Sequence, residues 1–275
     1  MIRLGPAGLP TTLDSKRRST IEGIKEVKNL GLNAMEIEFV RKIYLDENEA
    51  IEVGKVAKDL DVELSIHAPY FINLLSKSRE TIEKSKQLIL KCLKLAEIMN
   101  AKFVVVHAAY YGELSKEDAI NKMEEITIEL LNKMKSLKIK NSMLLYETMA
   151  KKSQFADLET LLELKERISH KQFGICIDFA HIFVFNDGKI DFEKIFEATK
   201  FEYYHTHFSN VKFNLKTKKF VDIHVNLNSH PNFKDLAKTL IEKKIENITI
   251  ISESPILEQD SLKMKRILEN LGYEF

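Results

Sequence analysis

Short apolar runs alternate with longer segments of helical periodicity along almost the whole chain. Eight runs rich in β-branched or other apolar residues are predicted to form strands. They cover residues 2–8, 34–39, 64–69, 103–108, 143–148, 173–178, 203–209 and 247–254. Strands that alternate with helices in this way are typical of repeated βα units around a parallel sheet.

The segments between these strands carry apolar residues at helical spacing. Two long examples run over residues 76–100 and 115–137. Ser115 is predicted to cap the second helix, with Asp118 three residues further on. The apolar side of the first helix is expected to include Ile82, Leu88, Leu90, Leu93 and Leu95.

Eight such units in 275 residues predict an α/β fold, a single (β/α)8 TIM-barrel domain over residues 1–275. The nine Gly and five Pro form no linker, and no low-complexity tract divides the chain. A doubly wound open sheet is the alternative, but its G-x-G-x-x-G motif does not follow the first strand. In a TIM barrel the reaction site lies at the carboxyl ends of the strands.

Imidazole and carboxylate side chains gather where the predicted strands end. Asp178 and His181 share a face if a helical turn follows the sixth strand, and Asp222 and His224 point the same way in extended backbone. Any one of these residues alone would be read as an ordinary buried polar group or surface charge. The whole set, with five of the eight histidines, is His67, His107, Glu147, Asp178, His181, His207, Asp222, His224 and Glu253.

The donor types in this set indicate divalent metal ions. Imidazole nitrogen combined with carboxylate oxygen suits zinc or manganese, whereas magnesium and calcium prefer oxygen alone. Burying several carboxylates side by side costs several kcal/mol per ion unless cations neutralise them. Because the set contains no thiolate, the metals are expected to be catalytic rather than structural.

Charge and cysteine content narrow the partners and the compartment. The 42 Lys and Arg against 41 Asp and Glu exclude a histone-like basic protein, although a local basic patch stays open. Cys92 and Cys176 are far apart in apolar surroundings, as in a reduced cytosolic protein. No apolar run approaches the length of a membrane span, and the N-terminus lacks a signal-peptide pattern. We therefore expect a cytoplasmic protein without a membrane partner.

Seven motifs surround the strand ends: SIHAPYFINL, VVVHAAYYG, LLYETMAKKSQF, GICIDFAHIF, YHTHFSNVK, FVDIHVNL and SESP. They run from residue 65 to residue 255 and resemble the endonuclease IV family of apurinic/apyrimidinic (AP) endonucleases, which are xylose-isomerase-like TIM barrels. The resemblance implies a hydrolase of base-excision DNA repair that cuts the phosphodiester 5′ to abasic sites in duplex DNA. All nine ligand positions of the family have a matching residue type here, in the same order.

The resemblance also implies three zinc ions, with manganese in part of the sites as an option. His67, His107 and Glu147 would hold the first zinc, and His181, Asp222 and His224 would hold the third. The second zinc would share Glu147 as a bridge, and its further ligands would be Asp178, His207 and Glu253. A metal-activated hydroxide would attack the phosphorus. Glu147 and Glu253 would thus be catalytic residues as well as ligands.

The same resemblance implies the DNA contacts. Tyr70 and Phe71 follow the first ligand histidine and would enter the duplex at the lesion, where unstacking costs least; the plainer interpretation is packing over the barrel mouth. Arg41 would contact phosphate or abasic sugar, unless it is simply solvated. A basic stretch before Asp222 would neutralise phosphates, unless it is a solvated hairpin or loop; its lysines are Lys212, Lys216, Lys218 and Lys219. The partner would be abasic duplex DNA, bound by a monomer.

Some residues depart from the family pattern and keep other functions open. Ala108-Ala109 stand where family members commonly have Pro-Gly, Thr148 stands where Asn is common, and Pro6-Ala7-Gly8 replace a histidine of some members. A sugar isomerase or epimerase on the same barrel, with one divalent metal, is the alternative function. A non-catalytic relative is a third hypothesis.

Three further polar residues lie inside the predicted strands. His205 faces the same side as His207 and is predicted to support it rather than to bind metal. Glu36 and Glu38 alternate with apolar residues in the second strand and are interpreted as polar groups of the core.

Overall fold

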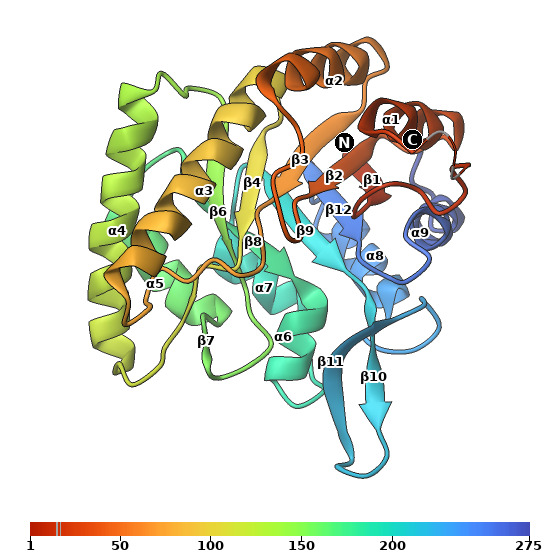
Figure 1. Ribbon diagram of the computed structural model, residues 1–275. Helices are drawn as coiled ribbons and strands as arrows, with labels where there is room; N and C mark the ends of the chain where they lie inside the picture. The colour runs from red at the N-terminus through yellow and green to blue at the C-terminus, as the bar shows by residue number, and fades with distance from the viewer. Residues whose placement is uncertain (15, 17) are drawn as a thin grey trace. The chain divides into compact units, whose positions relative to one another are not determined.

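The computed structural model of the protein describes residues 1–14, 16 and 18–275. In that part of the chain, eight parallel strands form one sheet in the order β1-β12-β9-β8-β6-β4-β3-β2 (Figure 1). A parallel bridge between Ala7, the residue after β1, and Glu36 of β2 links the two ends of this order, so the strands form a nearly closed TIM barrel. The strands are β1 (Ile2–Pro6), β2 (Ala34–Glu38), β3 (Glu63–His67), β4 (Phe103–Val106), β6 (Met143–Glu147), β8 (Phe173–Asp178), β9 (Tyr204–Phe208) and β12 (Ile248–Ser252).

All eight predicted strands are confirmed, and each ends within two residues of its predicted end. The predicted strands are longer than the observed ones because buried residues continue into the turns that follow. After β3, for example, Ala68 and Pro69 are still buried, but proline has no N–H to give to a sheet. Each ligand residue predicted at a strand end therefore lies within one residue of the end of its strand.

Nine helices lie between the strands of the described chain, and polar side chains cap most of them. Ser115 accepts a hydrogen bond from the backbone N–H of Asp118, which confirms the predicted cap. Asp46 and Glu49 form a capping box at the start of α2. The helices are α1 (Thr20–Asn29), α2 (Glu47–Asp59), α3 (Arg79–Met99), α4 (Lys116–Ser136), α5 (Leu158–Ile168), α6 (Phe179–Phe185), α7 (Phe192–Thr199), α8 (Phe233–Glu242) and α9 (Glu258–Asn270).

The buried side of α3 differs in part from the predicted one. Leu93 and Leu95 are buried as expected, but Ile82, Leu88 and Leu90 are only partly buried. The buried stripe mixes large apolar side chains with small ones, and it runs through Ser85, Ile89, Cys92, Ala96 and Met99. Residue size and hydropathy alone pointed to the leucines, whereas close helix packing favours the small side chains.

The residues divide into two compact units, 1–36 with 177–275 and 37–176. Both boundaries fall inside strands, in β2 between Glu36 and Ile37 and in β8 between Cys176 and Ile177.

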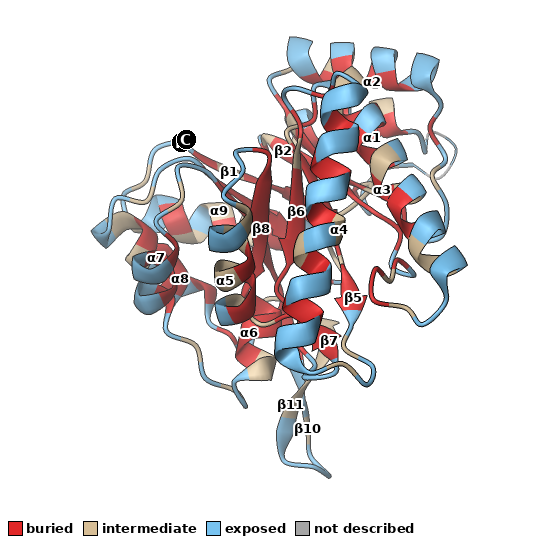
Figure 2. Ribbon diagram, turned by 90° about the vertical axis from the view of Figure 1, so that its left-hand side faces the viewer, coloured by how far each residue is buried: buried red, intermediate tan, exposed pale blue. Residues whose placement is uncertain are grey.

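The unit 37–176 has its core between its strands and helices. Phe103, Val105, Leu145 and Cys176 form a buried cluster from β4, β6 and β8. One side of α4 is buried and the opposite side is exposed (Figure 2). Burial of each large apolar side chain contributes about 1.5–3 kcal/mol. Two short antiparallel strands, β5 (Ala109–Tyr110) and β7 (Gln154–Phe155), pair beyond the ends of β4 and β6.

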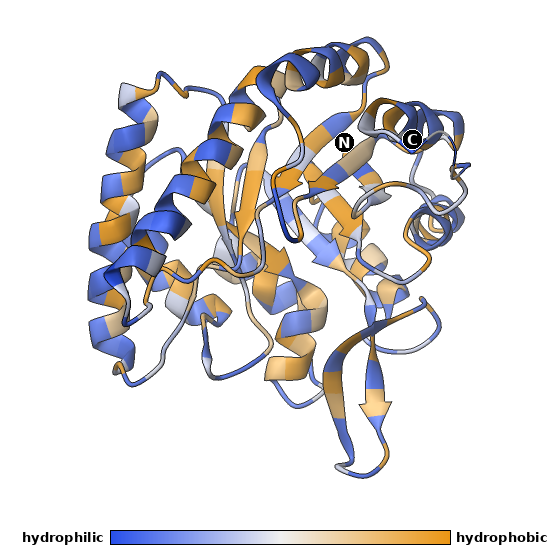
Figure 3. Cartoon of the chain, viewed as in Figure 1, coloured by the Kyte–Doolittle hydropathy of each residue, from blue (hydrophilic) through white to orange (hydrophobic). Residues whose placement is uncertain are grey.

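The unit 1–36 with 177–275 contains an antiparallel hairpin that extends away from its helices (Figure 1). Its strands are β10 (Asn210–Asn214) and β11 (Lys219–Val225), with a bulge between Val211 and Lys212. Phe220 anchors the hairpin, because the centroid of its ring lies 4.7 Å from that of Phe183 in α6. Helix α6 is strongly hydrophobic (Figure 3). The basic stretch, which the sequence left open as a phosphate contact or a solvated hairpin or loop, therefore lies on a hairpin.

Both cysteines are free and buried, as the composition predicted. Burial raises the pKa of the Cys92 thiol to about 12, so the thiolate is scarce at neutral pH. Among the described residues, none of the helices combines the length and the apolar character that a membrane crossing needs.

Candidate metal centre

The unit 37–176 brings His67, His107 and Glu147 together. Glu147 is the last residue of β6 and is fully buried. Its Oε2 lies 3.1 Å from Nε2 of His67, the last residue of β3, and 2.8 Å from Nε2 of His107, just after β4. The ligand atoms of these three residues all lie within 4.8 Å of one another.

The tautomer of His67 makes this group suitable for a cation. Nδ1 of His67 lies 2.8 Å from the backbone oxygen of Ala68, which can only accept, so Nδ1 carries the proton. Nε2 then presents a lone pair to the carboxylate of Glu147. Two ligand atoms of a tetrahedral zinc ion lie about 3.4 Å apart when each bond is about 2.1 Å. The observed separations fit a shared ion.

Tyr70 lies against the imidazoles of this group. Its ring centroid is 4.6 Å from that of His67 and 5.1 Å from that of His107. Its hydroxyl donates to Oε2 of Glu38 at 3.0 Å, so Glu38 holds Tyr70 in place. The next residue, Phe71, is 58% exposed against 37% for Tyr70. The loop after β3 thus has one anchored aromatic ring and one that projects into solvent.

The other unit brings together Asp178, His181, Asp222 and His224. A helical turn does follow the sixth strand, as α6, and Asp178 caps it by accepting the N–H of His181 at 2.7 Å. Asp178 Oδ2 lies 3.5 Å from His181 Nδ1, and Asp222 Oδ1 lies 3.4 Å from His181 Nε2. Asp222 Oδ1 is also 3.8 Å from His224 Nε2, across the i, i+2 pair of β11.

His224 in this group has the same tautomer pattern as His67. Its Nδ1 lies 3.1 Å from the backbone oxygen of Glu253 and must donate to it, which leaves Nε2 for a ligand. The ligand atoms of Asp178, His181 and His224 all lie within 4.8 Å of one another. Asp178 therefore shares this group with the three residues expected there. Each unit has a cluster that could hold a metal ion.

A third arrangement in the unit 1–36 with 177–275 surrounds His207 at the end of β9. His207 Nδ1 lies 3.4 Å from Oε1 of Glu253, while His207 Nε2 lies 2.8 Å from Oε1 of Glu36. The second oxygen of Glu36 lies 2.8 Å from Nε2 of His205. Burial opposes charge on Glu36, but the imidazoles of His207 and His205 outweigh it, and the pKa of this carboxyl lies well below its usual range.

The pairing of Glu36 with these histidines was not predicted from the sequence. Glu36 was interpreted as a polar core group and His205 as a support for His207, with no contact expected between the two. The sequence did contain a signal for this pairing, namely two carboxylates in an otherwise apolar strand. A buried carboxylate needs a partner, so the strand indicated that partners must exist.

The residues expected to contact DNA are at the surface. Arg41 is exposed in the bend after β2. The four lysines of the basic stretch are exposed on the hairpin β10–β11, and Lys219 forms an ion pair of 2.8 Å with Asp187. Leu215, between them, is 83% exposed.

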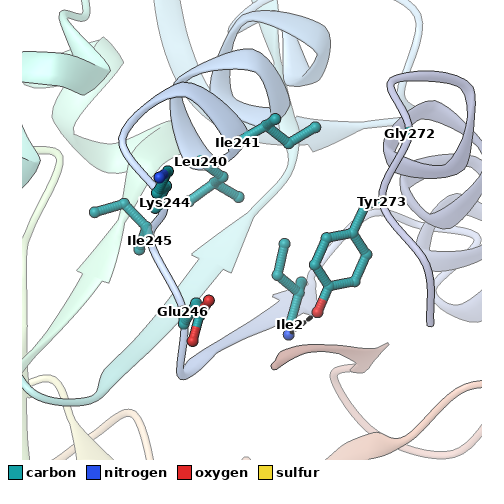
Figure 4. Close-up of a pocket in the computed structure, with 8 residues that line it drawn as sticks. All are labelled: Ile2, Leu240, Ile241, Lys244, Ile245, Glu246, Gly272 and Tyr273. Atoms are coloured by element: carbon teal, nitrogen blue, oxygen red, sulfur yellow. Dashed lines mark hydrogen bonds between the residues drawn. The ribbon is translucent and has the colours of Figure 1, made fainter.

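A small cavity of about 170 Å³ lies at the opposite ends of the strands in the unit 1–36 with 177–275 (Figure 4). Ile2 begins β1 beside it, and the N–H of Ile2 donates to the hydroxyl of Tyr273 at 2.7 Å. Amino-terminal ends of barrel strands serve stability rather than reaction chemistry. This cavity is therefore separate from the histidine groups at the carboxyl ends.

A family model described as a xylose isomerase-like TIM barrel matches residues 24–271. An uncharacterized protein of Methanocaldococcus jannaschii is 30% identical, and the alignment covers 98% of each chain. A probable endonuclease 4 of Mycoplasma genitalium is 29% identical over 70% of this chain and 67% of that protein. These relatives confirm the resemblance that the strand-end motifs indicated.

Solved structures from two different enzyme classes have the same fold. Endonuclease IV from Thermus thermophilus is 19% identical, with a TM-score of 0.71 over 92% of this chain and 94% of that one. The 3-keto-D-glucoside 4-epimerase of E. coli is 12% identical, with a TM-score of 0.72 over 98% of this chain and all of that one. Fold likeness alone therefore leaves the reaction open, and the side chains must decide it.

Proposed function

Because the chain belongs to the xylose isomerase-like TIM-barrel family, we propose that it is a metal-dependent AP endonuclease. It would hydrolyse the phosphodiester 5′ to abasic sites in duplex DNA during base-excision repair. The observation that carries the proposal is the occurrence of two histidine-carboxylate groups, one in each compact unit, at the carboxyl ends of the strands. The relatives described as endonuclease 4 support the same reaction class.

The metal ligands of the proposal are the nine residues expected from the sequence. His67, His107 and Glu147 would hold one zinc, and His181, Asp222 and His224 would hold another, with Asp178 beside them. We propose that Glu147 is also a bridging ligand. It would share a further zinc ion with Asp178, His207 and Glu253. Manganese in part of the sites is the option that the donor types leave open.

The metal and the side chains would contribute different parts of the chemistry. When bound, the metal supplies Lewis acidity that activates water and neutralises charge on the phosphate. His67 and His224 keep their Nδ1 protons on backbone oxygens, which orients both rings before any substrate arrives. Glu147, fully buried, carries the negative charge that draws cations to its group, and Glu253 is proposed to act with it.

The DNA would be held by three features of the surface. Phe71 and Tyr70 are proposed to enter the duplex at the lesion, and the anchoring of Tyr70 by Glu38 gives it a fixed orientation. The hairpin β10–β11 projects its lysines toward solvent, where they would meet phosphates. Arg41 is proposed as a further contact. We also propose that the protein acts as a monomer in the cytoplasm, in line with its free, buried thiols.

The proposal is tested by cleavage of a duplex that contains one synthetic abasic site. Zinc-loaded protein should cut the strand 5′ to the lesion, leave an undamaged duplex intact and lose activity in a chelator until zinc returns. The control is the same duplex with the abasic site replaced by a normal nucleotide. Zinc-loaded protein that leaves abasic DNA intact would refute the proposal.

A sugar isomerase or epimerase is the second candidate, because epimerase structures share the fold. An enzyme of this class usually needs one divalent metal, which would leave His107, Asp222 and His224 without an evident role. The proximity of His181 to both Asp178 and Asp222 therefore favours the endonuclease. Interconversion of sugars by the metal-loaded protein, without DNA cleavage, would establish the alternative.

A further inference from the structure

Glu36 is a carboxylate in the middle of a barrel strand, completely buried, with both oxygens directed at imidazoles. Oε1 lies 2.8 Å from Nε2 of His207 and Oε2 lies 2.8 Å from Nε2 of His205. The two histidines are neighbours on one face of β9, two residues apart. One carboxylate thus contacts two side chains of a strand that is 169 residues away in the chain.

The backbone around Glu36 is also fixed. Glu36 forms the parallel bridge to Ala7 that joins β2 to β1, and its carbonyl oxygen accepts the N–H of Gly8 at 2.8 Å. A buried carboxylate costs several kcal/mol unless it is paired, and here two imidazoles provide the pairing. The position of this carboxylate is therefore set by the closure of the barrel.

The two contacts of His207 differ in length, and the difference assigns its proton. Carboxylates face both ring nitrogens and can only accept, but Oε1 of Glu36 is nearer to Nε2, at 2.8 Å, than Oε1 of Glu253 is to Nδ1, at 3.4 Å, so the proton is assigned to Nε2. The opposite nitrogen, Nδ1, then presents its lone pair, and it lies 3.4 Å from Oε1 of Glu253. Two acceptor atoms at that separation match neighbouring ligands of a zinc ion, which lie about 3.4 Å apart.

From this geometry we infer that Glu36 is a positioning residue for His207: it holds the ring in the Nε2–H tautomer, with Nδ1 turned toward the metal. His205 anchors the other oxygen of Glu36 and keeps the carboxylate from rotating. The inference rests on the proposed metal site and deepens it. Neither Glu36 nor His205 binds the metal itself. Carboxylates that accept from ligand imidazoles commonly tune metal affinity about 10- to 100-fold.

The test is a metal titration of the Glu36→Ala variant. Apoprotein is titrated with Co²⁺, whose visible absorption reports the ligand geometry of each site as it fills. The variant should bind the ion held by His207 about 10- to 100-fold more weakly, with a changed spectrum for that ion. The ion held near His181 should bind as in the wild type.

The matched control is Glu38→Ala, two residues along the same strand, because Glu38 accepts from the hydroxyl of Tyr70 at 3.0 Å. Its affinity for the cobalt ion held by His207 should equal that of the wild type. If Glu36→Ala and Glu38→Ala bind cobalt alike, the inference is wrong. If the wild type itself binds no metal, the proposed metal site fails instead, so the two failures are distinguishable.

A measurement on the wild type covers the case in which Glu36→Ala does not fold. Nitrogen chemical shifts of ¹⁵N-histidine in the zinc-loaded protein distinguish a protonated ring nitrogen from one bound to metal. His207 should be protonated at Nε2 and bound through Nδ1, and His205 should be protonated at Nε2 without a metal. Zinc on Nε2 of His207 would overturn the inference, because Glu36 could not then accept from that atom.

Discussion

Nε2 of His67 and Oε2 of Glu147 lie 3.1 Å apart, although 80 residues separate them in the chain. The register of the sheet explains the contact. His67 lies in one row with Val105 of β4 and Leu145 of β6, and Glu147 stands one same-face step beyond that row. Side chains from strands that are not adjacent therefore converge where the parallel strands end.

Substitution of Glu147 by Gln should remove the first metal and abolish cleavage. The amide cannot supply the negative charge that the group needs, and its NH2 would face an imidazole or the ion. Metal content should fall by at least one ion per chain, while the far-UV circular dichroism stays that of the wild type. Normal metal content with full cleavage would contradict the role of Glu147.

Substitution of His224 by Ala should remove one metal and leave the His67 group loaded. His224 supplies Nε2 to the group with Asp178 and His181, and this group belongs to the other compact unit. Elemental analysis should show about one ion fewer per chain. His170→Ala is the control, because His170 is exposed two residues after the end of α5 and outside both groups. Equal metal loss in both variants would argue against a specific site.

Neutralising hairpin lysines should weaken DNA binding through electrostatics. The triple variant Lys212→Ala, Lys216→Ala and Lys218→Ala removes three exposed charges and spares Lys219, which pairs with Asp187. The slope of log affinity against log salt should fall by about 2 to 3, since each phosphate contact contributes about 0.9. Fluorescence anisotropy with a labelled abasic duplex at several salt concentrations measures this slope.

The control for the lysine variant is an equal loss of charge on another surface. Lys122, Lys133 and Lys135 are exposed on α4 and can be replaced by Ala together. Their loss should leave the salt slope nearly unchanged. If both triple variants change the slope equally, the hairpin makes no specific contact and only net charge matters.

Glu97 in the last turn of α3 should stabilise the fold at neutral pH more than at acid pH. Its carboxylate accepts the backbone N–H groups of Asn141 and Ser142 at 2.9 and 3.1 Å. Burial raises the pKa of Glu97, but these hydrogen bonds outweigh it, and the net pKa is lowered. Its contribution is therefore complete above the unfolded pKa of about 4.3 and is lost as pH falls through the folded pKa.

The Glu97→Gln variant should lower the free energy of unfolding by about 1–2 kcal/mol at pH 7. The difference from the wild type should be smaller at pH 3 than at pH 7, because falling pH approaches the lowered pKa of the wild-type carboxyl. Urea unfolding at both pH values measures it, and Glu125→Gln, at an exposed position of α4, should stay within about 0.5 kcal/mol of the wild type. A difference that grows toward pH 3 would contradict this account of Glu97.

Local sequence predicted the strands and the ligand residues because both depend on short-range pattern. A run such as FVVV must be buried on both sides, and a histidine directly after it must stand at the strand end. The i, i+2 pair of Asp222 and His224 likewise needs only extended backbone, which β11 provides. These features required no knowledge of which strands become neighbours in the sheet.

Contacts between distant strands could not be predicted in the same way. The pairing of Glu36 with His205 and His207 depends on barrel closure, which brings β2 close to β9. The contact of Tyr70 with Glu38 depends on the path of one loop across a strand end. Sequence pattern indicated that these polar groups needed partners, but only the three-dimensional arrangement identifies them.

The number of metal ions per chain tests the central claim most directly. Protein purified without chelators and analysed by inductively coupled plasma mass spectrometry should contain about three ions per chain, with zinc the main element. One ion per chain would contradict the endonuclease and favour a single-metal sugar enzyme. No bound metal, even after zinc is supplied, would contradict both.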